Sequence, residues 1–275
     1  MSDKTLLRVE GLSTWFHGPD GSVRAVDDVS LHVDAGETVA LVGESGSGKT
    51  ACGLSIMRLI REPGQIMAGR IHFEGLDLLS LPEQQMRAIR GDRIAMVFQE
   101  AGPAFDPTVS IGEQIVETLV AHRRFTSRDA KARAVELLRL VDIADPERRY
   151  RNYPHEFSGG MLQRAMIALA ISCEPRLLIA DEPTTSLDST TQAQILELLR
   201  GLSRRLGMAV LLVTHNFGIV ARYADRAYVM YQGKIVEEGS VAALYAAASH
   251  PYTRRLWASA RHFQRPGDRS AARVV

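Results

Sequence analysis

The chain has 275 residues, of which 45% are hydrophobic and 24% are charged, a composition typical of a soluble globular protein. Its formal net charge of +1 gives no excess of positive charge that would indicate a nucleic-acid partner. No stretch approaches the ~20 uninterrupted apolar residues of a membrane-spanning helix, and residues 1–4 lack the apolar region of a signal peptide. We therefore expect a cytoplasmic protein in which Cys52 and Cys173 are free, buried thiols.

The first 34 residues predict β-strands joined by a turn. Three apolar residues alternate with polar neighbours at the period of a half-buried strand: Val29, Leu31 and Val33. Residues 6–9 form a shorter candidate strand, and residues 17–21 have the composition of a turn. Trp15 and Phe16 stand just ahead of that turn, where an aromatic side chain either packs in the core or stacks on a nucleotide base. Their position alone leaves both interpretations open.

A glycine-rich segment follows the apolar run of residues 39–42 and opens a helix-compatible run, residues 51–60. It consists of Gly43, Glu44, Ser45, Gly46, Ser47, Gly48, Lys49 and Thr50. The pattern G-x-x-x-x-G-K-T between a strand and a helix predicts a phosphate-binding loop, in which backbone N–H groups and the helix N-terminus face a polyphosphate. Lys49 would contact the β- and γ-phosphates, and the Thr50 hydroxyl would bind Mg²⁺. A glycine turn without function is the alternative, which the complete motif disfavours.

Gln99 follows a continuous apolar strand, residues 93–98. Its side chain could reach a metal ion or an attacking water, although an amide at a strand end is more often simply solvated. From residue 101 the periodicity changes to that of helices: Ser110 and Glu113 have the spacing of a capping box, and a second helix begins near Ser127. This change predicts a helical subdomain inserted into an α/β core.

Ser158 precedes Gly159 and Gly160 at the predicted start of another helix. A serine cap followed by two glycines leaves backbone donors and the positive end of the helix dipole facing outward, which favours an anion. Plain helix capping explains the tripeptide equally well when it is considered alone.

Asp181 and Glu182 end a buried, parallel-type strand, residues 177–180. The carboxyl edge of an α/β sheet is where ligands bind, and adjacent carboxylates there are costly without a cation. We expect Asp181 to face Mg²⁺ and Glu182 to polarise a water molecule; a solvated acidic turn is the alternative. His215 stands just past the strand of residues 209–213, at the same edge, although a lone histidine is often only a surface or core residue.

Together these segments resemble the ATP-binding subunits of ABC transporters, over nearly the whole chain from Leu7 to about Ala260. The matching motifs are the phosphate loop (residues 43–50), the Q-loop (Gln99), the signature (residues 157–161, Phe-Ser-Gly-Gly-Met), the second acidic motif (residues 177–182), the D-loop (residues 186–188, Ser-Leu-Asp) and the switch histidine (His215). Residues 153–156, 180–185 and 250–256 resemble the oligopeptide, dipeptide and nickel importer branch. The chain departs from the family at Met161 of the signature and in the loop of residues 100–107. It also lacks the C-terminal cysteines of many branch members, so no metal or cluster is expected there.

The resemblance implies an α/β fold of the P-loop NTPase (ABC ATPase) type. Its parts would be a mostly parallel core sheet, an N-terminal antiparallel β subdomain and an inserted α-helical subdomain at about residues 101–165. One ATPase domain would span residues 1–260, followed by a flexible C-terminal tail, residues 261–275.

The resemblance also implies a site for ATP and Mg²⁺. The implied catalytic residues are Glu182 as general base, with His215, Gln99 and Lys49. The implied nucleotide contacts beyond the phosphate loop are Phe16 on the adenine ring, Gln99, Ser158, Gly159, Gly160, Asp181 and Asp188. Mg²⁺ would lie near Thr50, Gln99 and Asp181, with water between the ion and Asp181. The signature of one subunit would close over the nucleotide held by a second subunit.

The implied function is that of an ATP-hydrolysing importer subunit on the cytoplasmic face of the cell membrane, with di- or oligopeptides as the first choice of cargo. Nickel, an opine or another small solute is the alternative. The expected partners are a second ABC ATPase (a paralogue or a second copy), two integral membrane permease subunits and, indirectly, an extracytoplasmic solute-binding protein, with no nucleic acid. Two rivals are a non-transport ABC ATPase acting on nucleic acid or ribosomes, which usually has two cassettes or a basic extension, and a P-loop GTPase, whose Asn-Lys-x-Asp motif is absent.

Overall fold

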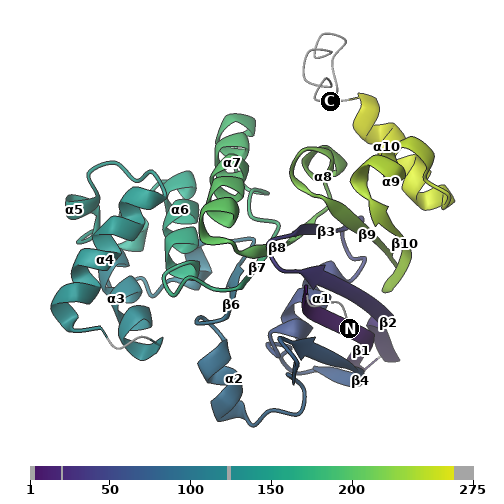
Figure 1. The fold of residues 1–275 in the computed structure, drawn as a ribbon, viewed down its shortest axis with the longest axis horizontal. Coiled ribbons are helices and arrows are strands. Elements are labelled where there is room, and N and C mark those ends of the chain that lie inside the picture. The colour runs from purple at the N-terminus through teal and green to yellow at the C-terminus, as the bar shows by residue number, and fades with distance from the viewer. Residues whose placement is uncertain (1–3, 20, 123–124, 263–275) are drawn as a thin grey trace.

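Two β-sheets form the framework of the protein (Figure 1). The structure is a computed structural model that describes residues 4–19, 21–122 and 125–262. The first sheet is antiparallel, with the strand order β2-β1-β4-β5. Its strands are β1 (Thr5–Gly18), β2 (Gly21–Asp34), β4 (Gly64–Phe73) and β5 (Leu76–Asp77).

The second sheet has the strand order β10-β9-β3-β8-β7-β6, and every neighbouring pair except β10–β9 is parallel. Its strands are β3 (Thr38–Val42), β6 (Ile94–Val97), β7 (Leu177–Asp181), β8 (Ala209–Thr214), β9 (Arg226–Tyr231) and β10 (Lys234–Ser240). All residues of β6, β7 and β8 are buried, as expected for strands covered on both faces. Because β8 lies between β3 and β7, the carboxyl ends of these three strands meet at one edge.

The helices cover the second sheet and form a separate group beside it. In chain order they are α1 (Lys49–Ile56), α2 (Glu83–Ile89), α3 (Ile111–His122), α4 (Ser127–Leu140), α5 (Pro146–Arg149), α6 (Gly159–Ala170), α7 (Ser189–Leu206), α8 (Phe217–Tyr223), α9 (Val241–Ala247) and α10 (Pro251–His262). Helices α3 to α6 lie between β6 and β7 in the chain and gather at the end of the molecule opposite the antiparallel sheet (Figure 1, left). This arrangement confirms the predicted fold class.

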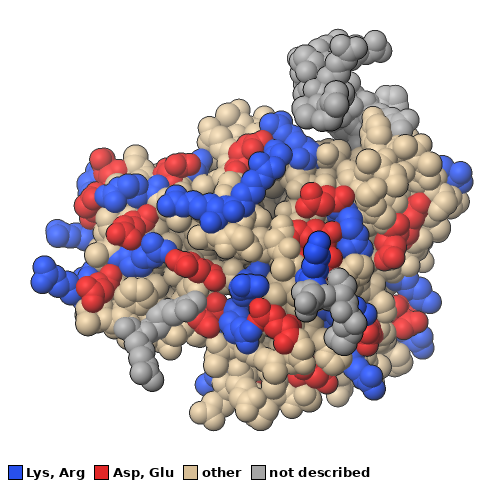
Figure 2. Space-filling view, viewed as in Figure 1, with Lys and Arg blue, Asp and Glu red and all other residues tan. Residues whose placement is uncertain are grey.

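Helices α3, α4 and α6 pack through apolar faces that repeat at helical spacing. The buried residues of these faces include Ile115, Leu119, Leu137, Leu138 and Ile167. Among the described helices, none is both long enough and apolar enough to cross a bilayer. On the face shown in Figure 2, acidic and basic side chains are interspersed.

Two local predictions differ from the structure. Strand β1 runs from Thr5 to Gly18 rather than over residues 6–9, because irregularities in its pairing with β2 interrupt the apolar alternation. Helix α1 ends at Ile56 rather than at residue 60. Arg58, two residues further on, adopts φ 51°, a backbone angle that is incompatible with a right-handed helix. The predicted tail lies outside the described residues from residue 263 onward.

The predicted capping box at the start of α3 forms in part. The backbone N–H of Glu113 donates to Ser110 Oγ at 3.4 Å, as expected. The Glu113 carboxylate, however, accepts from the Ser110 hydroxyl at 3.1 Å. The two side chains therefore bond to each other at the helix start, which changes the second half of the predicted motif.

Candidate nucleotide-binding site

The phosphate loop begins where β3 ends and enters α1 at Lys49. A Cβ atom on Gly43 would collide with the Met230 carbonyl oxygen, and one on Gly48 would collide with the Ala25 carbonyl oxygen. Gly48 also has φ +103°, which L side chains rarely adopt. Backbone from β9 and from β2 therefore presses against the loop, and glycine is required at both positions.

The Lys49 side chain is folded back over the loop. Its Nζ atom donates to the carbonyl oxygens of Gly43 and Glu44, both at 2.8 Å. Burial lowers the pKa of Lys49, while the carboxylates of Glu182 and Asp181 act in the opposite direction. The ammonium group is thus bonded to the loop and is influenced electrostatically by the two acidic residues.

Thr50 and Asp181 connect the phosphate loop to the end of β7. The Thr50 hydroxyl donates to Asp181 Oδ1 at 3.2 Å, and Asp181 is only 3% exposed. Burial raises the pKa of Asp181 to about 6, although the bond from Thr50 lowers it in part. A buried carboxylate of this kind favours a nearby cation.

Glu182 and His215 lie at the ends of the neighbouring strands β7 and β8. His215 Nδ1 is 3.0 Å from Glu182 Oε1, and the Thr185 hydroxyl donates to Glu182 Oε2 at 2.7 Å. Burial raises the pKa of Glu182, but the hydrogen bonds from His215 and Thr185, together with the electrostatic attraction of His215 and Lys49, outweigh it, so the pKa lies below its usual value. Glu182 adopts φ 44°, a conformation that is uncommon for a residue with a side chain and that occurs often at functional sites.

Two other predicted site residues, Gln99 and Asp188, are exposed. Gln99 lies just beyond β6, next to β7 in the sheet, and no hydrogen bond joins it to Asp181 or Glu182 among the described residues. Asp188 caps α7 by accepting from the backbone N–H groups of Thr190 and Thr191, both at 3.0 Å. A hydrogen bond with the Thr191 side chain, followed by those from the Thr191 and Thr190 backbone, lowers the pKa of Asp188.

The predicted turn before α6 is also exposed at Ser158 and Gly159. Ser158 Oγ accepts from the backbone N–H of Met161 at 3.4 Å, so Ser158 caps the helix as predicted. Phe157, the residue before it, is buried in the core of the helical group. The turn is therefore anchored from one side while its backbone faces outward.

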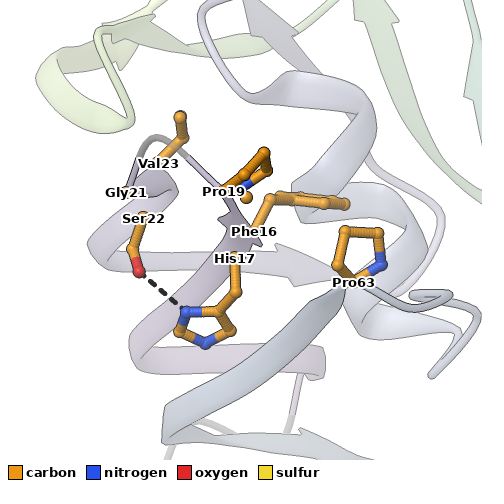
Figure 3. A pocket seen from close by; sticks show the side chains of 8 residues that line it. Phe16, His17, Pro19, Gly21, Ser22, Val23 and Pro63 are labelled. Atoms are coloured by element: carbon orange, nitrogen blue, oxygen red, sulfur yellow. Dashed lines mark hydrogen bonds between the residues drawn. The ribbon is translucent and has the colours of Figure 1, made fainter.

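Phe16 lines a pocket of about 420 Å³ formed by the β1–β2 turn and the segment before β4 (Figure 3). The other lining residues are His17, Gly18, Pro19, Gly21, Ser22, Val23 and Pro63. None of them belongs to the phosphate loop. The strand that carries Phe16 is nevertheless tied to α1, because Thr14 Oγ1 and Ser55 Oγ are 2.8 Å apart and buried.

The sequence did not single out two contacts that hold the loop. Tyr252 of α10 accepts from the backbone N–H of Glu44 at 2.8 Å, and Gly233 N–H in the β9–β10 turn donates to Ser47 O at 3.0 Å. Both partners come from the last part of the chain. Neither contact is apparent from residue type or spacing.

A phosphate loop whose threonine meets the carboxylate of a nearby parallel strand defines a P-loop nucleoside triphosphatase. The helical group between β6 and β7, with its exposed Ser-Gly-Gly turn, indicates the ABC type among P-loop nucleoside triphosphatases. The chain belongs to the ABC transporter family, whose pattern matches residues 26–185. It is accordingly an ATPase that binds ATP.

Relatives and solved structures agree with this family. The chain is 51% identical to a probable peptide ABC transporter ATP-binding protein of Sinorhizobium fredii, over 91% of this chain and 75% of the relative. It is 49% identical to the oligopeptide transport ATP-binding protein OppD of Bacillus subtilis, over 92% of this chain and 71% of that protein. The structure resembles that of the ATP-binding cassette MJ0796, a dimer bound to ADP and Pi, with a TM-score of 0.77 and 26% identity over 86% of this chain and 99% of that one. These similarities confirm the expected importer branch.

Proposed function

We propose that this chain is the ATP-hydrolysing subunit of a membrane importer for di- or oligopeptides, and that it works in a pair that closes over ATP. One observation carries the proposal: the chain presents two separate glycine-containing helix starts, each of which suits an anion. The phosphate loop belongs to the β3–α1 junction of the core sheet, and the Ser158 turn belongs to the helical group. A second subunit whose Ser158 turn faces this phosphate loop gives both elements a role.

Within one chain, the triphosphate binds along the loop from Gly43 to Thr50. Lys49 turns from its carbonyl partners toward the β- and γ-phosphates, and the loop amides and the start of α1 donate to the phosphate oxygens. Phe16 stacks on the adenine ring. Its neighbour Trp15 is less suited to this role, since the Arg24 guanidinium carbon already lies 4.6 Å from its ring centre.

The residues at the sheet edge fit a magnesium ion. Thr50 and Asp181 offer the hard oxygen atoms that Mg²⁺ prefers, and no group of three or more His, Cys, Asp or Glu among the described residues could hold a metal alone. Two protein oxygens completed by phosphates and water are the usual arrangement for Mg²⁺ at a nucleotide. Thr50, Asp181 (through water) and Gln99, which follows β6, would hold the ion, and the ion would supply neutralisation of phosphate charge.

Glu182 is the general base for the attacking water. His215 and Thr185 fix the direction of its carboxylate, and its lowered pKa keeps it ionised and able to accept a proton at neutral pH. His215 is half exposed, so its ring can also face the γ-phosphate. Gln99 and, from the facing subunit, Asp188 complete the surroundings of the nucleotide.

The names of the relatives support peptide import. The proteins from Sinorhizobium fredii and Bacillus subtilis are named as peptide and oligopeptide transport proteins, and the cassette MJ0796 is a dimer. We assign this chain a second ABC ATPase and two integral permeases as partners, on the cytoplasmic face of the membrane. Residues 1–260 act as one ATPase domain, with the helical group docking on the permeases.

Purification of the tagged chain from gently solubilised membranes tests the assembly. The proposal predicts two integral membrane proteins and a second ATPase in stoichiometric amounts. If this chain is the only ATPase recovered with the membrane proteins, the pair is a homodimer. Recovery of RNA, DNA or ribosomes without membrane subunits would overturn the transport function. Binding of peptides, rather than nickel or opines, to the associated extracytoplasmic receptor tests the cargo.

A further inference from the structure

The last helix of the described chain touches the phosphate loop directly. Tyr252, in the first turn of α10, is 1% exposed, and its hydroxyl accepts from the backbone N–H of Glu44 at 2.8 Å. The Glu44 carbonyl in turn accepts from Lys49 Nζ at 2.8 Å. Both polar groups of the Glu44 backbone are thus occupied, one by the C-terminal helix and one by the phosphate-binding lysine.

The tyrosine is itself held in place. Its ring centre lies 4.3 Å from that of Tyr231, at the end of β9. The loop that leads into α10 is fixed by Glu237 of β10, whose carboxylate accepts from Ser249 N–H at 2.6 Å and from His250 N–H at 3.2 Å. A continuous set of contacts therefore runs from β10 through the start of α10 to the phosphate loop.

Among the described residues, no other hydrogen bond ties the Glu44 backbone to a segment outside the loop and α1. Gly233 anchors Ser47 from the β9–β10 turn at 3.0 Å, near the second half of the loop. Tyr252 anchors Glu44, near its first half. Because both halves of the loop are held in place, ATP binding has a smaller entropic cost of ordering the loop to overcome.

We propose that Tyr252 is a positioning residue for nucleotide binding, and that through its hydroxyl α10 holds the phosphate loop ready for ATP. The inference rests on the proposed binding of ATP at this loop. It predicts an effect on the affinity for ATP and little effect on the chemical step. Tyr252 and Lys49 bond to opposite sides of the Gly43–Glu44 peptide group, whose N–H donates to Tyr252 and whose carbonyl accepts from Lys49.

The test compares two single-hydroxyl deletions in the same C-terminal region. Tyr252→Phe keeps the stacked ring and removes the contact. Tyr245→Phe is the matched control: Tyr245 lies in α9, is 39% exposed and packs edge-on against Trp257 at 5.3 Å. We expect Tyr252→Phe to raise the Kd and KM for ATP about three- to tenfold, as for one uncharged hydrogen bond, with kcat within about twofold and no change in the control.

Amide hydrogen exchange supplies a second readout, one part of which needs only the unmodified protein. In the unmodified, nucleotide-free protein the Glu44 amide should be protected, and Tyr252→Phe should speed its exchange about three- to tenfold or more, in line with the affinity change. An unprotected Glu44 amide in the unmodified protein overturns the proposal even if the variant does not fold. An unchanged KM, or an equal rise in Tyr245→Phe, overturns it as well.

The same experiment separates this inference from the proposed function. If the unmodified protein binds ATP and Lys49→Ala weakens binding while Tyr252→Phe does not, only the role of Tyr252 fails. If the unmodified protein shows no ATP binding, the proposed function fails first.

Discussion

His215 Nδ1 lies 3.0 Å from Glu182 Oε1, at the ends of two neighbouring parallel strands. Thr185 holds the other carboxylate oxygen at 2.7 Å, so the direction of the carboxylate is set from both sides. An ionised carboxylate in a fixed orientation suits a general base. The structure thus gives Glu182 the geometry that its proposed role requires.

Glu182→Gln should leave ATP binding intact and nearly abolish turnover. Glutamine keeps the size of the side chain but cannot accept the proton of water, so kcat should fall by about 10²–10⁴-fold. The matched control is Thr185→Val, which keeps the carboxylate and removes one hydrogen bond to it; its loss should be about tenfold or less. Phosphate release and equilibrium ATP binding measure the two effects. Full activity in Glu182→Gln would remove Glu182 from its role.

Lys49→Ala should weaken ATP binding by about 10- to 100-fold, the range expected for loss of hydrogen bonds to a charged group. Lys131→Ala is the control, because Lys131 is exposed on α4, in the helical group. Titration with a fluorescent ATP analogue gives both dissociation constants. Equal affinities in the two variants would contradict the assignment of Lys49.

Asp181→Asn should stabilise the metal-free, nucleotide-free protein above pH 6. The folded-state pKa of Asp181 is raised from 3.8 to about 6, so the folded protein binds this proton more tightly than the unfolded chain. The associated stability is fully present below pH 4 and is lost as the pH rises through about 6. Asparagine has no charge to bury, and the variant should gain about 2–3 kcal/mol at pH 8.

Urea unfolding in EDTA from pH 4 to pH 8 measures this difference. The gain of Asp181→Asn over the unmodified protein should shrink as the pH falls toward 4. A difference that does not change with pH would show that burial of charge at Asp181 is not its cause.

Gly48→Ala should abolish ATP binding and destabilise the fold by about 2 kcal/mol or more, because its Cβ atom meets the Ala25 carbonyl oxygen and its φ is +103°. Gly201→Ala is the control within α7, where a Cβ atom meets nothing within 4 Å. That change should stabilise the protein by about 0.5–1 kcal/mol. Thermal unfolding and ATP titration of both variants check the pair, and tolerance of alanine at Gly48 would contradict the packed loop.

The sequence predicted those parts of the site that depend on local order. The phosphate loop is one continuous segment between a strand and a helix, and an apolar run ending in Asp181 and Glu182 marks the carboxyl end of a buried strand. Parallel pairing then brings His215 to the same edge. These elements required only residue type, spacing and the rule that parallel strands end together.

Other parts depend on tertiary contacts that spacing does not reveal. Tyr252 and Glu44 are 208 residues apart in the chain, and residues 250–256 indicated a resemblance to the importer branch but no contact with the phosphate loop. The full length of β1 could not be predicted from its sequence, because the irregularities that interrupt its apolar alternation depend on its pairing with β2 and β4. Side-chain directions, such as that of Lys49 toward its own loop, also follow from packing rather than from spacing.

Photocrosslinking from bound nucleotide tests the paired arrangement most directly. ATP with a photoreactive group on its γ-phosphate is bound to a complex in which this chain carries Lys49→Ala and the other ATPase subunit is unmodified. The account predicts that the tryptic peptide of residues 152–164, which contains Ser158, is still labelled in the Lys49→Ala chain, because the facing subunit holds that nucleotide. Two results would contradict closure of one subunit over the ATP of the other. The first is labelling of this peptide only when Lys49 is present in the same chain, and the second is no labelling of it while the unmodified subunit binds the analogue.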